Sequence, residues 1–153
     1  MRRNVASLED LRVLAEGFLK KVSELPLSED ATVVGLSGDL GAGKTAFTKC
    51  VASALGIRDL VTSPTFILEK VYIIPRGSVV GERFTKLIHI DAYRLKDGSE
   101  MKALDWQAIL KDEHNLILLE WPEQVESAIP KDMIKLSFEY ESERVRNVTG
   151  ELI

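Results

Sequence analysis

Residues 38–45 combine glycine, lysine and threonine at the spacing of a phosphate-binding loop. The segment Gly38-Asp-Leu-Gly-Ala-Gly-Lys-Thr45 satisfies the P-loop pattern Gly-x4-Gly-Lys-Thr in full. Glycines let the backbone curl so that successive amides face phosphate oxygens, and the N-terminus of a following helix adds its dipole. In such loops the lysine, here Lys44, contacts the β- and γ-phosphates, and the hydroxyl, here of Thr45, faces Mg²⁺. The motif therefore predicts a site for a nucleoside triphosphate with magnesium.

Two acidic residues follow apolar segments that are typical of buried strands. Asp91 ends the segment 87–90 and Glu120 ends the segment 116–119. Parallel strands deliver their last residues to the sheet edge that holds the phosphates, so both carboxylates are candidates to hold the metal or position water. The residues alone leave the division of these two roles open. His89, inside the first of these two apolar segments, is interpreted as a packed histidine rather than a catalytic one.

The segments on either side of the loop have the pattern of an α/β domain. Residues 31–36 are a β-branched run that predicts a strand buried on both faces. Residues 46–55 have apolar side chains at helical spacing and stop at a glycine, a typical helix C-cap. An N-terminal helix is predicted over residues 8–25 from its single apolar stripe. Ser7 followed by Asp10 resembles a capping box at the start of that helix.

The remaining segments predict further strands and one more helix. Residues 66–74 and 84–90 are strand-like and flank a Pro-Arg-Gly-Ser turn, which predicts a hairpin. Residues 99–110 have the pattern of an amphipathic helix, and residues 133–140 and 144–153 that of two strands around a turn. The element order predicts an α/β, P-loop NTPase-like three-layer sandwich with a mostly parallel, mixed central sheet.

The composition predicts one globular domain over residues 1–153. Hydrophobic residues make up 45% and charged residues 29%, which excludes a disordered chain. The net charge of −4 disfavours autonomous nucleic-acid binding, which needs a basic face. The single cysteine, Cys50, excludes an internal disulfide framework and a cysteine-rich zinc site, and it fits a reducing compartment. No apolar run is long enough to span a bilayer, so we expect a cytoplasmic protein without membrane contact.

Several kinds of P-loop protein can be compared with this pattern. Guanine specificity is disfavoured, because the sequence has neither an Asn-Lys-x-Asp tetrad nor an Asp-x-x-Gly turn. A small-molecule kinase would use the same loop, although residues 95–115 lack the basic lid that such kinases usually carry. A nucleotide-gated interaction module, in which ATP only orders residues 63–66, is a further alternative. The residues considered so far leave these alternatives open.

Four motifs, in this order and spacing, resemble those of the TsaE family. They are the P-loop, Ser63-Pro-Thr-Phe66, His89-Ile-Asp-Ala-Tyr-Arg94 and Glu120-Trp-Pro-Glu123. This family consists of bacterial ATPases needed for threonylcarbamoyladenosine, a modification of the adenosine beside the tRNA anticodon. The resemblance implies ATP and Mg²⁺ as cofactors and an ATP hydrolase that is slow and depends on its partners. It implies the TsaD and TsaB proteins as partners, with tRNA reached only indirectly through them.

The resemblance also implies roles for individual residues. Thr45 and Glu120 match the family's magnesium-binding positions. Asp91 matches an acidic position required for turnover, where it would order the attacking water. Trp121 matches a position linked to activity, and Thr65 lies in a segment that resembles a switch loop able to sense the γ-phosphate. The other positions implied to contact the nucleotide are Gly41, Ala42, Gly43, Lys44 and Ala46, together with Ser7 and Arg146 near the termini.

Overall fold

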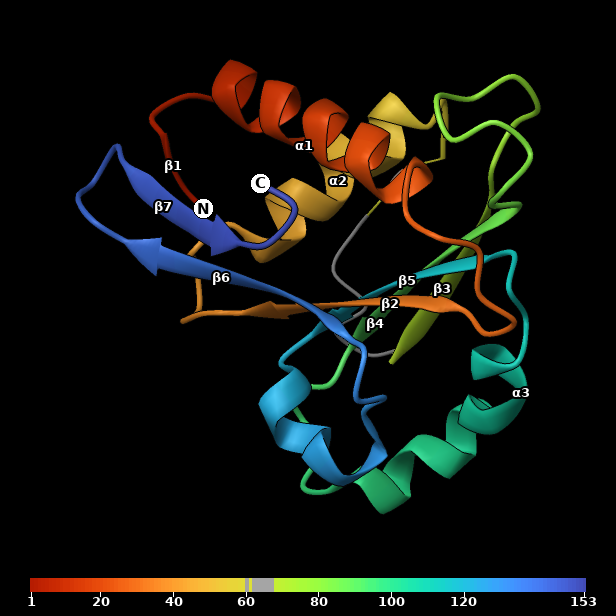
Figure 1. The fold of residues 1–153 in the computed structure, drawn as a ribbon. Coiled ribbons are helices and arrows are strands. Elements are labelled where there is room, and N and C mark those ends of the chain that lie inside the picture. The colour runs from red at the N-terminus through yellow and green to blue at the C-terminus, as the bar shows by residue number, and fades with distance from the viewer. Residues whose placement is uncertain (60, 62–67) are drawn as a thin grey trace.

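The computed structural model describes residues 1–59, 61 and 68–153. These residues form a seven-stranded sheet with helices on both faces, which confirms the predicted α/β sandwich (Figure 1). The strands are β1 (Arg2–Val5), β2 (Thr32–Ser37), β3 (Glu69–Ile73), β4 (Lys86–Asp91), β5 (Asn115–Glu120), β6 (Ile134–Tyr140) and β7 (Arg146–Gly150). The helices are α1 (Leu8–Ser23), α2 (Lys44–Ala54) and α3 (Trp106–Leu110), with 3₁₀ helices η1 (Gly98–Leu104) and η2 (Pro122–Ala128).

The sheet is mixed, with a parallel centre and antiparallel margins. Its strand order is β1-β7-β6-β2-β5-β4-β3. Strands β6, β2, β5 and β4 run parallel, whereas β7, β1 and β3 pair antiparallel with their neighbours. Within the parallel part, Glu120 is in register with Leu36 on one side and Asp91 on the other. The carboxyl ends of three central strands therefore meet at one edge of the sheet.

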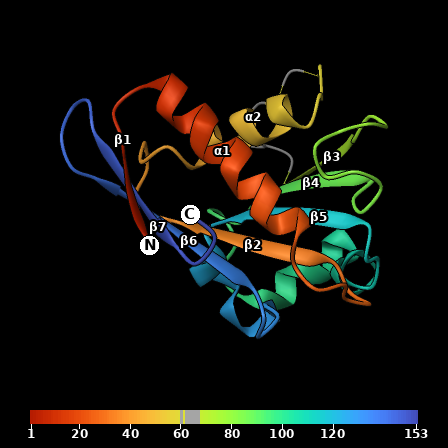
Figure 2. The same cartoon turned by 45° about the horizontal axis from the view of Figure 1, so that its top comes forward.

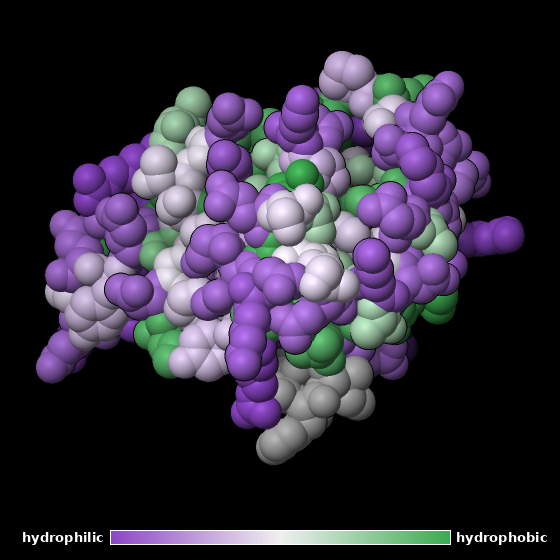
Figure 3. All heavy atoms as spheres, turned by 90° about the horizontal axis from the view of Figure 1, so that it is seen from below, coloured by the Kyte–Doolittle hydropathy of each residue, from purple (hydrophilic) through white to green (hydrophobic). Residues whose placement is uncertain are grey.

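Two apolar layers attach the helices to the sheet. Helices α1 and α2 cover one face, while η1, α3 and η2 cover the other (Figures 1 and 2). Helix α1 contributes a stripe of buried side chains at helical spacing, consisting of Leu11, Ala15, Phe18, Leu19 and Val22. The outer surface of the η1, α3 and η2 layer is largely hydrophilic, with small apolar patches (Figure 3). No helix in the described part of the chain has the length and apolar character needed to cross a membrane.

The predicted helix over residues 99–110 is divided into two pieces. An Asp97–Glu100 capping box starts η1, and Asp105 then adopts the left-handed conformation (φ 56°) before α3 begins. Aspartate tolerates this conformation better than most residues, because its short polar side chain can bond locally. The apolar spacing continues across this break, so periodicity alone predicts one helix.

The other predicted strands are present in the structure, although their bounds differ from those predicted. Strands β3 and β4 form the predicted antiparallel hairpin, although residues 66 and 67 of its first predicted strand lie outside the described residues. The two C-terminal strands appear as β6 and β7. Strand β1 and helix η2 were not predicted. Strand β1 has a polar sequence and is defined by its pairing with β7, a contact between the two ends of the chain.

Candidate functional site

The P-loop connects the end of β2 to the start of α2, and its conformation requires glycine. Gly38, Gly41 and Gly43 have φ values of 141°, 77° and 109°, in the region that L side chains rarely adopt. At Gly38 a Cβ atom would also lie 2.2 Å from the carbonyl oxygen of Phe138. The glycine spacing found in the sequence is therefore explained by backbone geometry and by close packing against β6.

The N-terminus of α2 presents backbone amides without intrahelical acceptors to the site. Gly43 occupies the N-cap position, and no side chain of the described residues caps the helix. The first helical hydrogen bond runs from the Phe47 amide to the Gly43 carbonyl at 2.9 Å. The amides of Lys44, Thr45 and Ala46 precede that bond, so they lack intrahelical acceptors and can donate to an anion.

Lys44 is almost fully buried, with 4% of its surface exposed, and its ammonium group faces the loop. The ammonium donates to the carbonyl oxygens of Gly38 and Asp39, the second at 2.9 Å. Burial lowers the pKa of Lys44, while the nearby carboxylates, Glu120 foremost, act in the opposite direction. Among the described residues its hydrogen-bond acceptors are neutral carbonyls, and a buried cation bonded in this way is suited to an anionic ligand.

Glu120 connects the parallel strands to the P-loop helix. The residue is 3% exposed at the end of β5, and its Oε1 accepts a hydrogen bond from the Thr45 hydroxyl at 2.9 Å. The same oxygen lies 2.8 Å from Nε2 of His89. Because the Thr45 hydrogen is directed at Glu120, the lone pairs of the hydroxyl are available on its other side. A hydroxyl and a carboxylate in this arrangement fit a Mg²⁺ ion that also takes phosphate oxygens.

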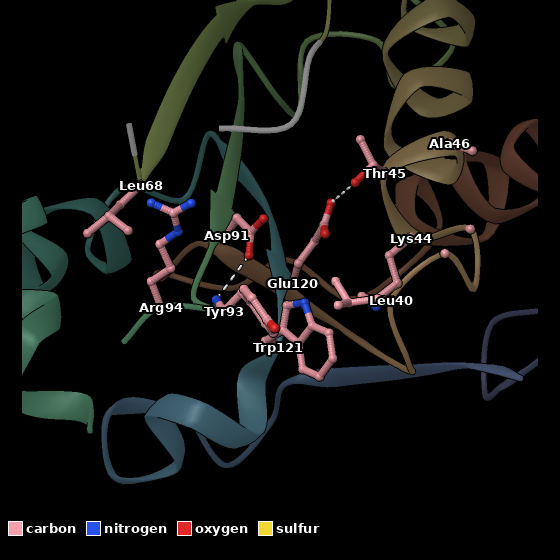
Figure 4. Close-up of a pocket in the computed structure, with 12 residues that line it drawn as sticks. Leu40, Lys44, Thr45, Ala46, Leu68, Asp91, Tyr93, Arg94, Glu120 and Trp121 are labelled. Carbon is pink, nitrogen blue, oxygen red and sulfur yellow. Dashed lines mark hydrogen bonds between the residues drawn. The ribbon is translucent and has the colours of Figure 1, made fainter. Parts of the chain in front are cut away.

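Asp91 is the second carboxylate at this edge of the sheet. It ends β4 in register with Glu120, and its Oδ1 accepts a hydrogen bond from the amide of Tyr93 at 3.0 Å. Figure 4 shows the Asp91 and Glu120 side chains entering the same cleft from neighbouring strands. Within the described residues, no three His, Cys, Asp or Glu side chains form a metal-binding group. A magnesium ion here would therefore depend on few protein ligands and on the nucleotide.

These groups line one cleft of about 490 Å³, a size in the usual range for small-molecule sites. The Trp121 ring forms part of its wall and packs at 5.0 Å against the ring of Tyr93 (Figure 4). Trp121 has a left-handed backbone (φ 59°) directly after β5, which turns the chain into η2. The described residues that line the cleft are Leu40, Gly41, Gly43, Lys44, Thr45, Ala46, Leu68, Asp91, Tyr93, Arg94, Glu120 and Trp121.

The structure thus brings together most of the site residues expected from the sequence. Ala42 lies within the loop without lining the cleft, and its amide donates to the Asp39 carbonyl at 3.1 Å. Ser7 accepts a hydrogen bond from the Asp10 amide as the N-cap of α1. Arg146 lies against the Tyr140 ring, with 4.3 Å between its guanidinium carbon and the ring centre.

Ser7 and Arg146 do not line the cleft, but both lie at the same edge of the sheet as the P-loop. Arg146 opens β7 opposite Tyr140, and Val5 ends β1 opposite Arg146. Since β6 runs parallel to β2, the end of β6, the start of β7 and the end of β1 lie at the sheet edge from which the P-loop leaves. Their contact with a nucleotide stays a prediction. The same holds for Thr65, which lies outside the described residues.

Four of the described cleft residues were not predicted from the sequence. Tyr93 and Arg94 lie in the motif that contains Asp91, and Leu40 lies inside the P-loop, so each has a sequence neighbour that signals the site. Leu68 precedes β3 and had no comparable signal. It reaches the cleft because its carbonyl accepts a hydrogen bond from the Asp91 amide at 3.0 Å.

Comparison with known proteins gives the family of the chain. The model of the family described as "Threonylcarbamoyl adenosine biosynthesis protein TsaE" matches residues 5–148. The chain belongs to the TsaE family. The resemblance carried by the four sequence motifs is thereby confirmed.

Individual TsaE relatives match over most of their length. The tRNA threonylcarbamoyladenosine biosynthesis protein TsaE of Streptomyces coelicolor is 38% identical over 122 residues, covering 76% of this chain and 77% of its own. The TsaE of Treponema pallidum is 35% identical over 123 residues, covering 80% and 84%. The crystal structure of YdiB from Bacillus subtilis superposes with a TM-score of 0.71 at 24% identity, covering 98% of this chain and 83% of that one. This last likeness concerns the fold.

Proposed function

We propose that this TsaE family member is a Mg²⁺-dependent ATP hydrolase that supports the formation of tRNA threonylcarbamoyladenosine by a TsaD–TsaB complex. Family membership and the names of the relatives support the pathway. The observation that carries the hydrolase proposal is the 2.9 Å hydrogen bond from Thr45 to Glu120 at the N-terminus of α2. This bond joins the P-loop hydroxyl to a strand-end carboxylate, the pair that P-loop NTPases use to hold magnesium.

The P-loop residues would bind and orient the triphosphate. The amides of Lys44, Thr45 and Ala46 point from a helix N-terminus, where backbone donors and the dipole both favour anions. Lys44 would exchange its two loop carbonyls for phosphate oxygens, gaining charge-assisted hydrogen bonds in place of neutral ones. Bound Mg²⁺ would neutralise charge on the β- and γ-phosphate oxygens, with Thr45 and Glu120 as the residues that hold it.

Asp91 would position the attacking water. Its carboxylate lies in the cleft beside Glu120, and one of its oxygens is held by the Tyr93 amide. A carboxylate fixed in this way can accept a proton from water and aim the water oxygen along one line. The water oxygen would bond to the γ-phosphorus while its proton passes to Asp91. The bond between that phosphorus and the bridging oxygen would break, releasing ADP and inorganic phosphate.

Two features support protein partners rather than direct contact with tRNA. The net charge of −4 gives the chain no general attraction for a polyanion. At the rim of the cleft, Leu40 and Tyr93 are 69% and 45% exposed. Apolar side chains exposed beside a nucleotide site favour a protein surface that covers them and completes the site.

A reconstituted reaction tests this proposal. Purified chain, TsaD, TsaB, unmodified tRNA, ATP and a preformed activated threonylcarbamoyl donor would be combined, with phosphate release and modified tRNA measured together. We expect inorganic phosphate to appear and modification to continue over many cycles. Thr45→Val should slow phosphate release at least tenfold. Thr48→Val is the matched control, because the Thr48 hydroxyl is buried one turn later and bonds the Lys44 carbonyl at 3.2 Å.

The other outcomes separate the alternatives. Transfer of the γ-phosphoryl group to a metabolite would identify a small-molecule kinase. ATP-dependent binding to TsaD and TsaB without phosphate release would identify an interaction module. Absence of ATP binding by the wild-type chain would contradict every version of the proposal.

A further inference from the structure

His89 is a buried polar side chain that the proposed chemistry has not used. It lies in the middle of β4 with no exposed surface. Leu87, two residues earlier on the strand, packs in the core beneath α1 and α2, so strand alternation places His89 on the same face. On β5 the same alternation places Leu118 and Glu120 on this face. The imidazole therefore lies in an apolar layer directly beneath the P-loop helix.

The polar contact of this imidazole is directed at the site. Its Nε2 lies 2.8 Å from Oε1 of Glu120, and a hydrogen on Nε2 is required for donation to a carboxylate oxygen. Its other nitrogen, Nδ1, has no hydrogen-bond partner among the described residues. Burying a polar group with one nitrogen unsatisfied costs free energy that a leucine would avoid. Packing alone therefore does not explain a histidine at this position.

Two donors converge on one oxygen of Glu120. The Thr45 hydroxyl donates to Oε1 from α2, and His89 donates to the same atom from β4. Two bonds from different directions fix the plane of the carboxylate, and they leave Oε2 outside both bonds. Thr45 is thereby also fixed, since its hydroxyl hydrogen points at Oε1 and its lone pairs point away. Figure 4 shows the Thr45–Glu120 part of this arrangement.

We propose that His89 is a positioning residue that holds the Glu120 carboxylate, and through it the Thr45 hydroxyl, in the orientation that binds Mg²⁺ with the nucleotide. The inference rests on the proposed function, because it assigns the support of that same metal site. Partners that orient metal ligands in this way typically change metal affinity or activity by about 10–100-fold when they are removed. His89 contacts neither nucleotide nor metal in this proposal.

The test compares His89→Leu with His89→Gln. Leucine fills the volume without a donor, whereas the glutamine amide can return a donor near the position of Nε2. ATP affinity would be measured by calorimetry with EDTA and then with Mg²⁺, and kcat and KM for ATP would follow. In EDTA we expect His89→Leu to bind ATP with the wild-type affinity. The increase in ATP affinity on adding Mg²⁺ should be about 10–100-fold smaller than in the wild type. The variant should lower kcat by a larger factor than it raises KM. His89→Gln should recover most of both quantities.

Leu118→Val is the matched control for a disturbed core. Leu118 is buried in the same layer and pairs with His89 in the strand register, but it has no polar group. We expect it to lower thermal stability while leaving the Mg²⁺ dependence unchanged. The inference is overturned if His89→Leu keeps the full Mg²⁺ dependence, or if Leu118→Val loses it to the same degree. A wild-type chain whose ATP affinity does not respond to Mg²⁺ would instead remove the proposed function itself.

Discussion

The ammonium group of Lys44 lies 4.3 Å from the centre of the Trp121 ring, so the start of α2 touches the first residue after β5. Cations at this distance from an aromatic face are attracted to it, by roughly 2 kcal/mol where water is excluded. The Trp121 amide also donates to the Leu36 carbonyl at 3.1 Å, which ties the same residue to the end of β2. The lysine, the tryptophan and the strand that precedes the P-loop are thus joined in one small contact network.

Replacing Lys44 should strongly weaken nucleotide binding without unfolding the chain. The Lys44 side chain contacts loop carbonyls and the Trp121 ring, and its charged form is disfavoured by burial. We expect Lys44→Met to keep the free energy of unfolding at or above that of the wild type, because a buried charge is removed. ATP affinity should fall at least tenfold, the equivalent of about 1.5–3 kcal/mol for a charged hydrogen bond. Urea unfolding and calorimetric titration measure the two quantities. Unfolding of the variant at low urea would contradict the interpretation.

The two strand-end carboxylates should differ in what they control. Asp91→Asn should leave Mg²⁺-dependent ATP affinity near the wild-type value while lowering kcat by roughly 10²–10⁴-fold, the usual contribution of a positioned acid or base. Glu120→Gln should weaken the Mg²⁺-dependent affinity as well, because Glu120 bonds Thr45. ATP affinity would be measured with and without Mg²⁺, together with the rate of phosphate release. These measurements separate metal binding by Glu120 from water positioning by Asp91. If the two variants show the same pattern, the proposed division of labour is wrong.

Replacing glycine by alanine should change the free energy of unfolding in opposite directions at Gly43 and at Gly17. Gly43 has φ 109°, so Gly43→Ala is strained although nothing lies within 4 Å of a Cβ there, and we expect a loss of about 1–2 kcal/mol together with weaker ATP binding. Gly17 is in the interior of α1, where a Cβ also meets nothing within 4 Å. Gly17→Ala should therefore raise the free energy of unfolding by about 0.8–1 kcal/mol. Equal effects of the two substitutions in urea unfolding would exclude backbone conformation as the cause.

Asp10 should contribute stability that depends on acid pH. The backbone amide of Ala6, followed by the Ser7 side chain, holds the pKa of Asp10 below its ordinary value of 3.8. A carboxyl group with a depressed folded-state pKa stabilises the fold above its unfolded-state pKa, and this contribution disappears as pH falls through the lower, folded-state pKa. The stability difference between wild type and Asp10→Asn should thus be constant above about pH 5 and shrink below pH 3.8. Urea unfolding at a series of pH values would show this, and a difference that grows in acid would refute it.

The elements that the sequence predicted well are those that local patterns determine. Helix α1 has a capping serine and one apolar stripe, and β2 and β5 are apolar runs buried by helices on both faces. Strand β1 could not be predicted in this way, because Arg2, Arg3 and Asn4 have no strand pattern and pair with residues 147–149. Its existence depends on closure of the whole chain.

The site could be predicted further than the fold, since phosphate chemistry requires particular residue types. Lys44, Thr45, Asp91 and Glu120 were all expected, and the structure places them in one cleft. The link from His89 to Glu120 could not be predicted, because sequence separation of 31 residues says nothing about register between β4 and β5. A buried histidine and a histidine that supports a metal ligand look alike until that register is known.

The position of the site in the sheet has a consequence for how the protein loses function on heating. Strands β2, β5 and β4, which deliver the P-loop and both carboxylates, are consecutive, while β1 and β3 are the outermost strands of the described sheet. Outer elements open at lower cost than central ones. Fraying of β1 would leave Thr45, Asp91 and Glu120 aligned, because β1 pairs with β7 at the far end of the described sheet. Fraying of β3 would remove the hydrogen bond from the Asp91 amide to the Leu68 carbonyl. Thermal inactivation that precedes collapse of the whole domain should therefore begin at β3.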